Sequence, residues 1–202
     1  MPLWLSSLPL VLASRSEVRG KILGAAGLRI EIRPAPIDER VIEKEVGPLS
    51  AAKAATLLAR AKALAVSASL PGRLVLGADQ TLSIGAQRFD KPADREDARN
   101  QLRALRGRTH ELHSAIAVAR DGTVLFEHRD AAKLTMRNFD DDFLENYLEF
   151  AREAALLSVG GYQVESAGIQ LFERIEGDHF TILGLPLLPL LEFLREQSVI
   201  AK

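Results

Sequence analysis

An aspartate at the end of an apolar run, and a lysine twelve residues later, are the residues of this chain with the clearest chemical potential. Residues 74–78 have the pattern of a buried strand, and Asp79 follows them directly. In α/β proteins, binding and catalytic groups gather at the carboxyl ends of strands. Lys91, just before Pro92, is expected to face the same end. A carboxylate can take a proton from water, and a lysine beside it can neutralise an anion.

A second polar cluster follows an earlier apolar run. Residues 13–19 read Ala-Ser-Arg-Ser-Glu-Val-Arg and are predicted to open a helix, because Ser14 and Glu17 have the spacing of a capping box. Unpaired amides at a helix N-terminus attract phosphate, and Arg19 suits bidentate phosphate contact. As isolated residues, Ser14 could be a plain helix cap and Arg19 a solvated charge. Together the two clusters predict an enzyme that binds a polyphosphate.

The composition limits the classes of function that fit this chain. Its 202 residues suffice for a single domain, which we expect to fold as two lobes with residues 1–8 as a loose N-terminal segment. Lysine and arginine number 26 against 27 acidic residues, so a polyanion must be held by a local site and stable nucleic-acid binding is not expected. No cysteine is present, which excludes a thiolate metal site and fits a cytoplasmic protein. No apolar run approaches the roughly 20 residues that cross a bilayer, so no membrane partner is expected.

The alternation of apolar strands and helical patterns predicts an α/β fold. Residues 34–40 are expected to form a loop that carries Asp38 and Glu39. The predicted elements are strands over 9–13, 28–33, 74–79 and 168–175, a hairpin turn over 83–86, a long hairpin over 109–118 and 124–136 turned by Asp121-Gly122, and helices over 14–26, 48–68, 94–105, 140–152 and 186–197.

Short blocks that combine glycine with charged residues are spread over about residues 9–195. They are Leu12-Ala13-Ser14-x-Ser16-x-x-Arg19, Asp38-Glu39, Lys62-Ala63, Gly77-Ala78-Asp79, Lys91-Pro92, Gly107-x-Thr109-His110, Gly160-Gly161-Tyr162 and Gly184-Leu185-Pro186. In this order they resemble the Maf family of nucleotide pyrophosphatases. One such block would mean little, but the whole series is a specific signal.

The resemblance implies a central mixed, twisted sheet flanked by helices, with a deep substrate groove between two lobes. It implies a cytoplasmic house-cleaning enzyme that hydrolyses a nucleoside triphosphate to the monophosphate and pyrophosphate with Mg²⁺ or Mn²⁺. A homodimer is one oligomeric state that stays open. Asp79 would be the general base, Lys91 and Glu39 would be further catalytic residues, and Glu39 and Asp79 would hold the metal. The phosphates would be bound by Ser14, Arg19, Lys62 and Lys91.

Three further positions are candidate substrate-binding residues that bear on the base. Gln80 and Glu165 stand where the branch linked to thymidine and uridine triphosphates usually has threonine and glutamine, so the chain is more similar to the branch linked to 7-methylguanosine triphosphate. A carboxylate at position 165 can accept from both N1–H and N2–H₂ of guanine. Val18 stands where that branch can have tryptophan, and valine offers a cationic base no aromatic face.

Two alternatives to this function stay open. One is a pyrophosphatase of the same family that prefers dTTP and UTP. The other is a nucleotide-binding regulator of cell division without catalysis, against which the joint presence of Lys62, Asp79 and Lys91 argues.

The histidines do not predict a metal site. His110 and His113 are three residues apart on a predicted strand, which places them on opposite faces. We expect a structural or supporting role for His110, and packing rather than catalysis for Tyr162.

Overall fold

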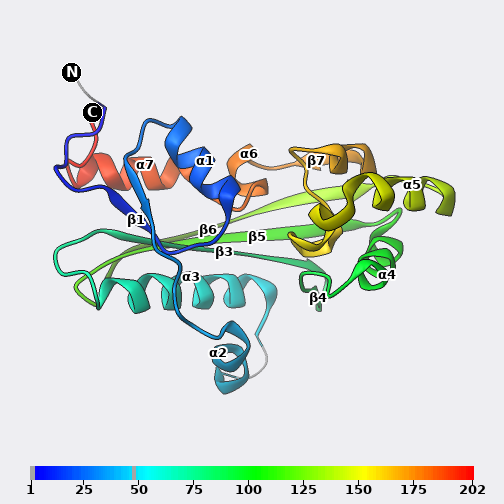
Figure 1. The fold of residues 1–202 in the computed structure, drawn as a ribbon, viewed down its shortest axis with the longest axis horizontal. Helices are drawn as coiled ribbons and strands as arrows, with labels where there is room; N and C mark the ends of the chain where they lie inside the picture. Colours follow the sequence, from blue (N-terminus) through cyan, green and yellow to red (C-terminus); the bar gives the residue numbers. More distant parts are fainter. Residues whose placement is uncertain (1–2, 47–48) are drawn as a thin grey trace.

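A mixed sheet runs the length of the molecule in the computed structural model, which describes residues 3–46 and 49–202 (Figure 1). Its strands are β1 (Leu10–Leu12), β2 (Ile30–Ile32), β3 (Val75–Ile84), β4 (Gln87–Phe89), β5 (Thr109–Arg120), β6 (Thr123–Met136) and β7 (Phe172–Glu176). They are ordered β2-β1-β3-β5-β6-β7, and β4 pairs with β3 off this path. β2, β1 and β3 are parallel, whereas the remaining pairs are antiparallel.

Helices cover both faces of this sheet, which confirms the predicted α/β fold with a mixed central sheet. The helices are α1 (Glu17–Ala25), α2 (Glu39–Val46), α3 (Ala51–Ser67), α4 (Arg95–Leu105), α5 (Asp141–Ala151), α6 (His179–Ile182) and α7 (Leu187–Glu196), with 3-10 turns η1 (Arg152–Leu156), η2 (Val159–Gly161) and η3 (Ala167–Leu171). Within the described ranges, no helix is long and apolar enough to cross a membrane.

The long hairpin of β5 and β6 ties the two ends of the molecule together. The strands stay paired from Thr109↔Thr135 to Arg120↔Thr123. Asp121 and Gly122 both have positive φ, 52° and 72°, as a tight two-residue turn that matches strand twist requires. The predicted hairpin is confirmed and is slightly longer than expected.

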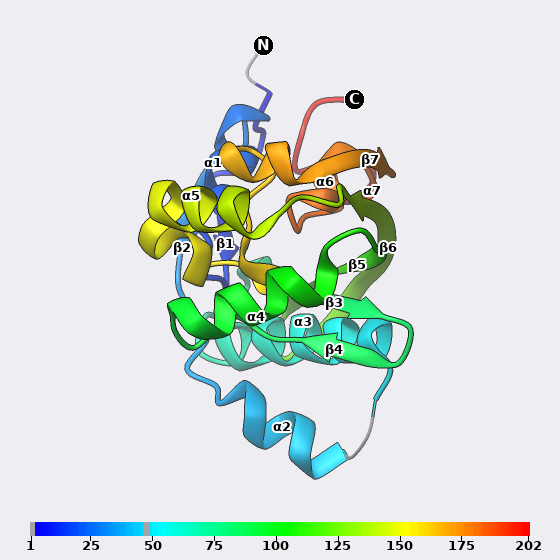
Figure 2. The same ribbon diagram turned by 90° about the vertical axis from the view of Figure 1, so that its right-hand side faces the viewer.

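Helix α3 packs against strands β3 and β5 of the sheet (Figure 2). Small side chains make this approach feasible, because alanines of α3 pack on alanines of β5: Ala55, Ala59 and Ala63 against Ala115, Ala117 and Ala119. At Gly77 of β3 no side chain would fit, since a Cβ there would lie 2.1 Å from the carbonyl oxygen of Ala59 and 2.7 Å from the amide nitrogen of Ala63. The glycine is therefore required by the backbone of α3 itself.

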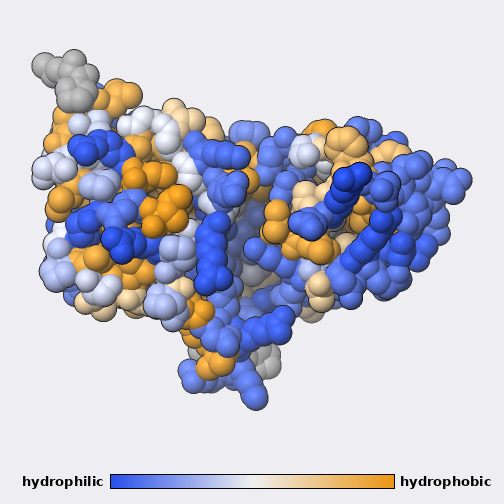
Figure 3. Space-filling view, in the orientation of Figure 1, coloured by the Kyte–Doolittle hydropathy of each residue, from blue (hydrophilic) through white to orange (hydrophobic). Residues whose placement is uncertain are grey.

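The opposite face of the sheet is covered by two separate apolar cores. One contains residues of β1, α1 and α7, such as Leu12, Leu23 and Leu190. The other lies under α4 and α5 and contains residues such as Leu102 and Leu144. Figure 3 shows the surface hollowed between the two halves, with hydrophilic residues around the hollow. The two lobes expected from the sequence correspond to these two cores.

Several predicted boundaries are wrong. Strand β3 continues to Ile84, so Asp79 lies in its middle rather than at its end. Residues 39–46 form helix α2, whereas the predicted loop extended to residue 40 and no element was predicted for residues 41–46. The predicted strand 168–175 starts at Phe172, because the residues before it form η3.

The N-terminal segment is tied to the C-terminus. Trp4 is buried and forms an isolated bridge with Ile200, and the Leu5 amide donates to the Val199 carbonyl at 2.9 Å. The expectation of a loose segment over residues 1–8 does not fit Trp4. Residues 1–2 of this predicted segment lie outside the described part of the chain.

Replacing Gly77 by alanine should destabilise the fold by about 2 kcal/mol or more, because the new Cβ would overlap the backbone of α3. Urea unfolding measures this. Gly24→Ala is the matched control: no atom lies within 4 Å of a Cβ at this helical position, so stability should rise by about 0.5–1 kcal/mol. Wild-type stability of Gly77→Ala would contradict the close approach of α3.

Candidate active site

A lysine shared by two carboxylates forms the centre of the site. The Lys62 Nζ of α3 lies 2.6 Å from Oδ1 of Asp79 on β3 and 2.8 Å from Oε1 of Glu39, the first residue of α2. The side chains of Lys62 and Asp79 are 11% and 10% exposed, whereas that of Glu39 is 48% exposed. Three of the predicted site residues, more than 15 positions apart from one another in the chain, are thus brought together.

The close approach of α3 explains this meeting. Residues two apart on a strand share a face, so Gly77 and Asp79 both point toward α3. Without a side chain at Gly77, the α3 backbone comes down next to β3 at Ala59 and Ala63. Lys62 precedes Ala63 on α3, and its side chain therefore reaches Asp79, which lies two residues after Gly77 on the same face of β3.

Burial sets the electrostatics of Asp79. Desolvation raises the pKa of Asp79 above its ordinary value, while the positive charges of Lys62 and Arg19 pull that pKa down and the charge of Glu39 adds to the rise. Among the described residues, none donates a hydrogen bond to its second oxygen, Oδ2. That oxygen is free to accept a proton from a water molecule.

Arg19 is held by the protein through two of its three guanidinium nitrogens. Its Nε donates to the Gly184 carbonyl at 2.8 Å, and its Nη1 donates to the Ala78 carbonyl at 2.8 Å and to Ser14 Oγ at 3.1 Å. Burial lowers the pKa of Arg19, against the charges of Asp79 and Glu39, but a guanidinium stays protonated in proteins. In the described part of the chain no acceptor contacts Nη2, so this nitrogen can bind an external anion.

Ser14 does not cap α1, contrary to the prediction from its spacing to Glu17. The cap is Ser16, whose hydroxyl accepts from the Arg19 amide at 3.4 Å. The Ser14 hydroxyl instead accepts from the Ser16 amide at 3.2 Å and from the Arg19 side chain. The Ser14 hydroxyl therefore links the backbone of segment 13–19 to the Arg19 side chain.

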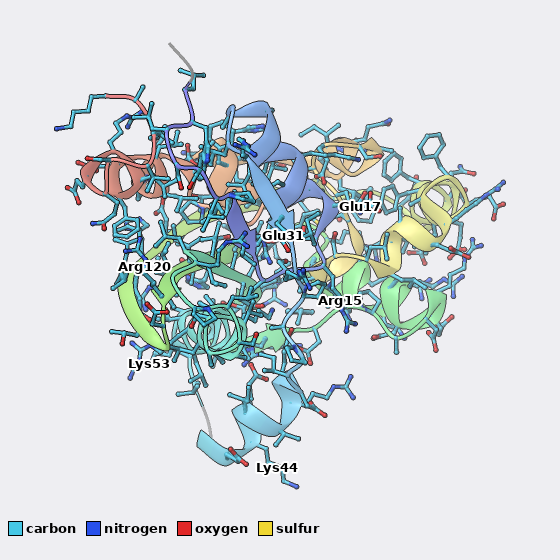
Figure 4. All side chains as sticks on the ribbon, turned by 60° about the vertical axis from the view of Figure 1, so that its left-hand side comes forward. Arg15, Glu17, Glu31, Lys44, Lys53 and Arg120 are labelled. Carbon is cyan, nitrogen blue, oxygen red and sulfur yellow. The ribbon has the colours of Figure 1, made fainter. Side chains whose placement is uncertain are left out.

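Arg15 and Glu17 are the exposed residues of the same segment, and Figure 4 shows both where the chain enters α1. Lys44 lies on the projecting helix α2 in the same view. Helix α2 is fastened at two points, by Glu39 to Lys62 and by Glu43 to Arg88 of β4 at 2.8 Å.

Three predicted site residues are not brought into this cluster. Lys91 is exposed and, among the described residues, makes no ion pair or hydrogen bond. Because Phe89 pairs with Leu82 in antiparallel register, the chain after β4 nevertheless heads back along β3 toward Asp79. Glu165 is exposed in the turn between η2 and η3, and Val18 is half-buried on α1.

Gln80 is occupied by the protein. Its Nε2 contacts the Ser114 hydroxyl at 2.9 Å and the carbonyls of Thr181 and Ile182 at 3.2 and 2.9 Å. The sequence analysis missed Ser114, Thr181 and the Gly184 carbonyl. Only Gly184 had a signal, as part of the block that ends at Pro186.

The residues present fit a hard divalent cation. Glu39 and Asp79 offer carboxylate oxygens beside one lysine nitrogen, and Mg²⁺ is bound by few protein oxygens together with substrate phosphates. In residues 3–46 and 49–202, no three His, Cys, Asp or Glu side chains are grouped so that they could hold a metal ion.

His110 and Tyr162 form a buried pair away from this cluster. Nε2 of His110 lies 2.6 Å from the Tyr162 hydroxyl, and Nδ1 is buried without a partner in the described structure. Burial lowers the pKa of His110 to about 4 and raises that of Tyr162, so both are neutral at neutral pH. The pair belongs to the core under α4 and α5, in agreement with a structural role.

Comparison with known proteins places the chain among nucleotide-processing enzymes. The Maf family model, described as Maf-like protein, matches residues 9–197. A Rhodopseudomonas palustris protein named nucleoside triphosphate pyrophosphatase is 56% identical over 201 residues, which covers 100% of both chains. A Rhizobium etli protein named 7-methyl-GTP pyrophosphatase is 54% identical over 196 residues, 95% of this chain and 97% of that protein. Among solved structures, a HAM1 protein from Coxiella burnetii aligns with a TM-score of 0.41 and 18% identity over 65% of this chain and 74% of that one.

Replacing Lys62 by glutamine should raise the pKa of Asp79 further, because Lys62 is the largest of the influences that lower it. Carboxyl-carbon NMR during a pH titration measures this, with the Asp79 signal assigned by its absence in Asp79→Asn. Lys53→Gln, an exposed lysine of the same helix, should leave the titration midpoint unchanged. The same midpoint in Lys62→Gln and wild type would rule out the contact.

Proposed function

This chain belongs to the Maf family of nucleoside triphosphate pyrophosphatases, and from that premise we propose that Asp79 is its general base and Lys62 the lysine that neutralises the phosphates. The observation that supports these roles is the position of Lys62 Nζ between the carboxylates of Asp79 and Glu39. Hydrolysis of the α,β-anhydride yields a nucleoside monophosphate and pyrophosphate.

Charge balance supports a divalent cation in this reaction. Arg19 and Lys62 contribute two positive charges, and Glu39 and Asp79 contribute two negative ones, so the cluster cannot alone neutralise a triphosphate. We propose that Glu39 and Asp79 hold Mg²⁺ or Mn²⁺, which supplies the missing positive charge beside the phosphates when bound.

The remaining residues have separate parts in the proposed reaction. Oδ2 of Asp79 takes the proton of the attacking water, and the bridging oxygen leaves with pyrophosphate. Nη2 of Arg19 contacts a phosphate oxygen, since its other donors are held by the protein. Lys91 binds the outer phosphates, because β4 is antiparallel to β3 and the chain after β4 runs back toward Asp79.

For the base we propose 7-methylguanine, with Glu165 as the residue that contacts it. The named Rhizobium etli relative supports this substrate, and an exposed carboxylate is free to accept two hydrogen bonds from a guanine edge. The Rhodopseudomonas palustris relative has a name that specifies no base at a similar identity.

Replacing Asp79 by asparagine should lower kcat by at least about a hundredfold, because the shape is kept and the proton acceptor is lost. Pyrophosphate release from a triphosphate with Mg²⁺ measures the rate, and calorimetric titration with the nucleotide should show that binding is retained. The control is Asp90→Asn, whose parent side chain is 81% exposed and lies outside the cluster. Turnover at the wild-type rate would refute the role of Asp79.

Replacing Glu165 by glutamine should shift preference from 7-methylguanosine triphosphate toward UTP by about tenfold or more in relative kcat/KM, because the amide offers a donor that guanine cannot use. Glu173→Gln, which changes an exposed glutamate on β7, serves as the control. If Glu165→Gln ranks the triphosphates as wild type does, Glu165 does not read the base.

A further inference from the structure

We propose that the half-buried Gln80 and the buried Ser114 form a clamp that positions Arg19 through the turn at α6, and that Gln80 is a positioning residue rather than a reader of the base. This inference rests on the proposed function, in which Arg19 binds phosphate. It gives a structural task to residues that have none in the reaction described above.

The contacts of Gln80 show how its amide is used. Its Nε2 lies within hydrogen-bond distance of the Thr181 and Ile182 carbonyls and of Ser114 Oγ. The two carbonyls can only accept, so the nitrogen and not the oxygen of the amide must face them. Both N–H groups of Gln80 are therefore committed to protein acceptors.

Ser114 supports the same turn from the neighbouring strand. It pairs with Gln80 across β3 and β5, its side chain is fully buried, and its hydroxyl donates to the Thr181 carbonyl at 2.7 Å. Thr181 is held further by its own hydroxyl, which donates to Asp130 Oδ2 at 3.1 Å, and by its amide, which donates to Asp178 Oδ1 at 2.9 Å. Two strands of the sheet thus fix one turn.

The turn passes this constraint to Arg19. The Gly184 amide donates back to the Thr181 carbonyl at 3.0 Å, and the Gly184 carbonyl accepts from Arg19 Nε at 2.8 Å. Gly184 has φ +86°, and a Cβ there would lie 3.2 Å from Arg19 Nη2 and 3.5 Å from Gln80 Oε1. The arginine, the glycine and the glutamine are therefore packed as one unit.

This unit decides where the free nitrogen of Arg19 lies. Nε is held by Gly184, and Nη1 is held by Ser14 and Ala78, so the plane of the guanidinium is fixed from both ends. Loosening the turn frees Nε and lets Nη2 move away from the phosphate position. Because Arg19 contacts phosphate and no base, the loss should be the same for every nucleotide.

Ser114→Ala tests the clamp without touching a residue of the site surface. The first readout is NMR of the Arg19 Nε–H, assigned by its absence in Arg19→Lys. Its exchange with solvent should be slow in wild type and at least about tenfold faster in Ser114→Ala, because the Gly184 acceptor is no longer fixed. Ser83→Ala, another buried serine on an adjacent strand, is the control and should leave the exchange rate unchanged.

The second readout is binding of inorganic tripolyphosphate, which has no base, beside 7-methylguanosine triphosphate and UTP. Ser114→Ala and Gln80→Ala should weaken the affinity of all three by a common factor of about five to twenty. In an Arg19→Lys background, Ser114→Ala should add nothing.

Unchanged Arg19 exchange in Ser114→Ala would overturn the clamp, whatever wild type binds. A Gln80→Ala effect on one nucleotide only, with tripolyphosphate affinity intact, would overturn it in favour of base reading by Gln80. A protected Arg19 signal that Ser114→Ala releases, in a protein that binds no polyphosphate, would support the clamp and contradict the proposed function instead.

Discussion

The close contact between α3 and β3 is the constraint on which the site depends. A residue with a side chain at position 77 would push α3 away, since the Ala59 carbonyl lies 2.1 Å from where its Cβ would be. Moving α3 would also move Lys62, whose nitrogen is the shared partner of Asp79 and Glu39. The position of the charge therefore depends on the packing of small residues, because the helix that packs on the sheet also carries Lys62.

The site divides into a rigid floor and an exposed rim. Asp79, Lys62 and Arg19 are buried and held by the sheet, by α3 and by the turn at Gly184. Glu39 and Lys91 are exposed, and Glu39 sits on a helix fastened mainly by ion pairs. A buried floor in a low dielectric keeps electrostatic contacts strong, while the exposed rim is free to adjust to the proposed polyphosphate and cation.

Local signals predicted much of the fold, but not the contacts between distant segments. The hairpin at Asp121-Gly122 was correct because its turn chemistry is local. The end of β3 was misplaced because polar residues beyond Asp79 are buried, as in Thr81, whose hydroxyl donates to the Ala51 carbonyl at 2.8 Å. Helix α2 was missed because its residues are mostly charged and its support comes from Lys62 and Arg88. The contact of Arg19 with Gly184 spans 165 residues, and no local pattern indicates it.

In the proposed function, the cluster of Lys62, Asp79, Glu39 and Arg19 cleaves the α,β-anhydride of a triphosphate. The most direct test is to identify the products when the wild-type protein is incubated with triphosphates and Mg²⁺ or Mn²⁺, with a chelator in a parallel sample. We expect monophosphate and pyrophosphate in equal amounts, and no turnover with the chelator. Release of orthophosphate and diphosphate, or no release from any triphosphate, would contradict the account.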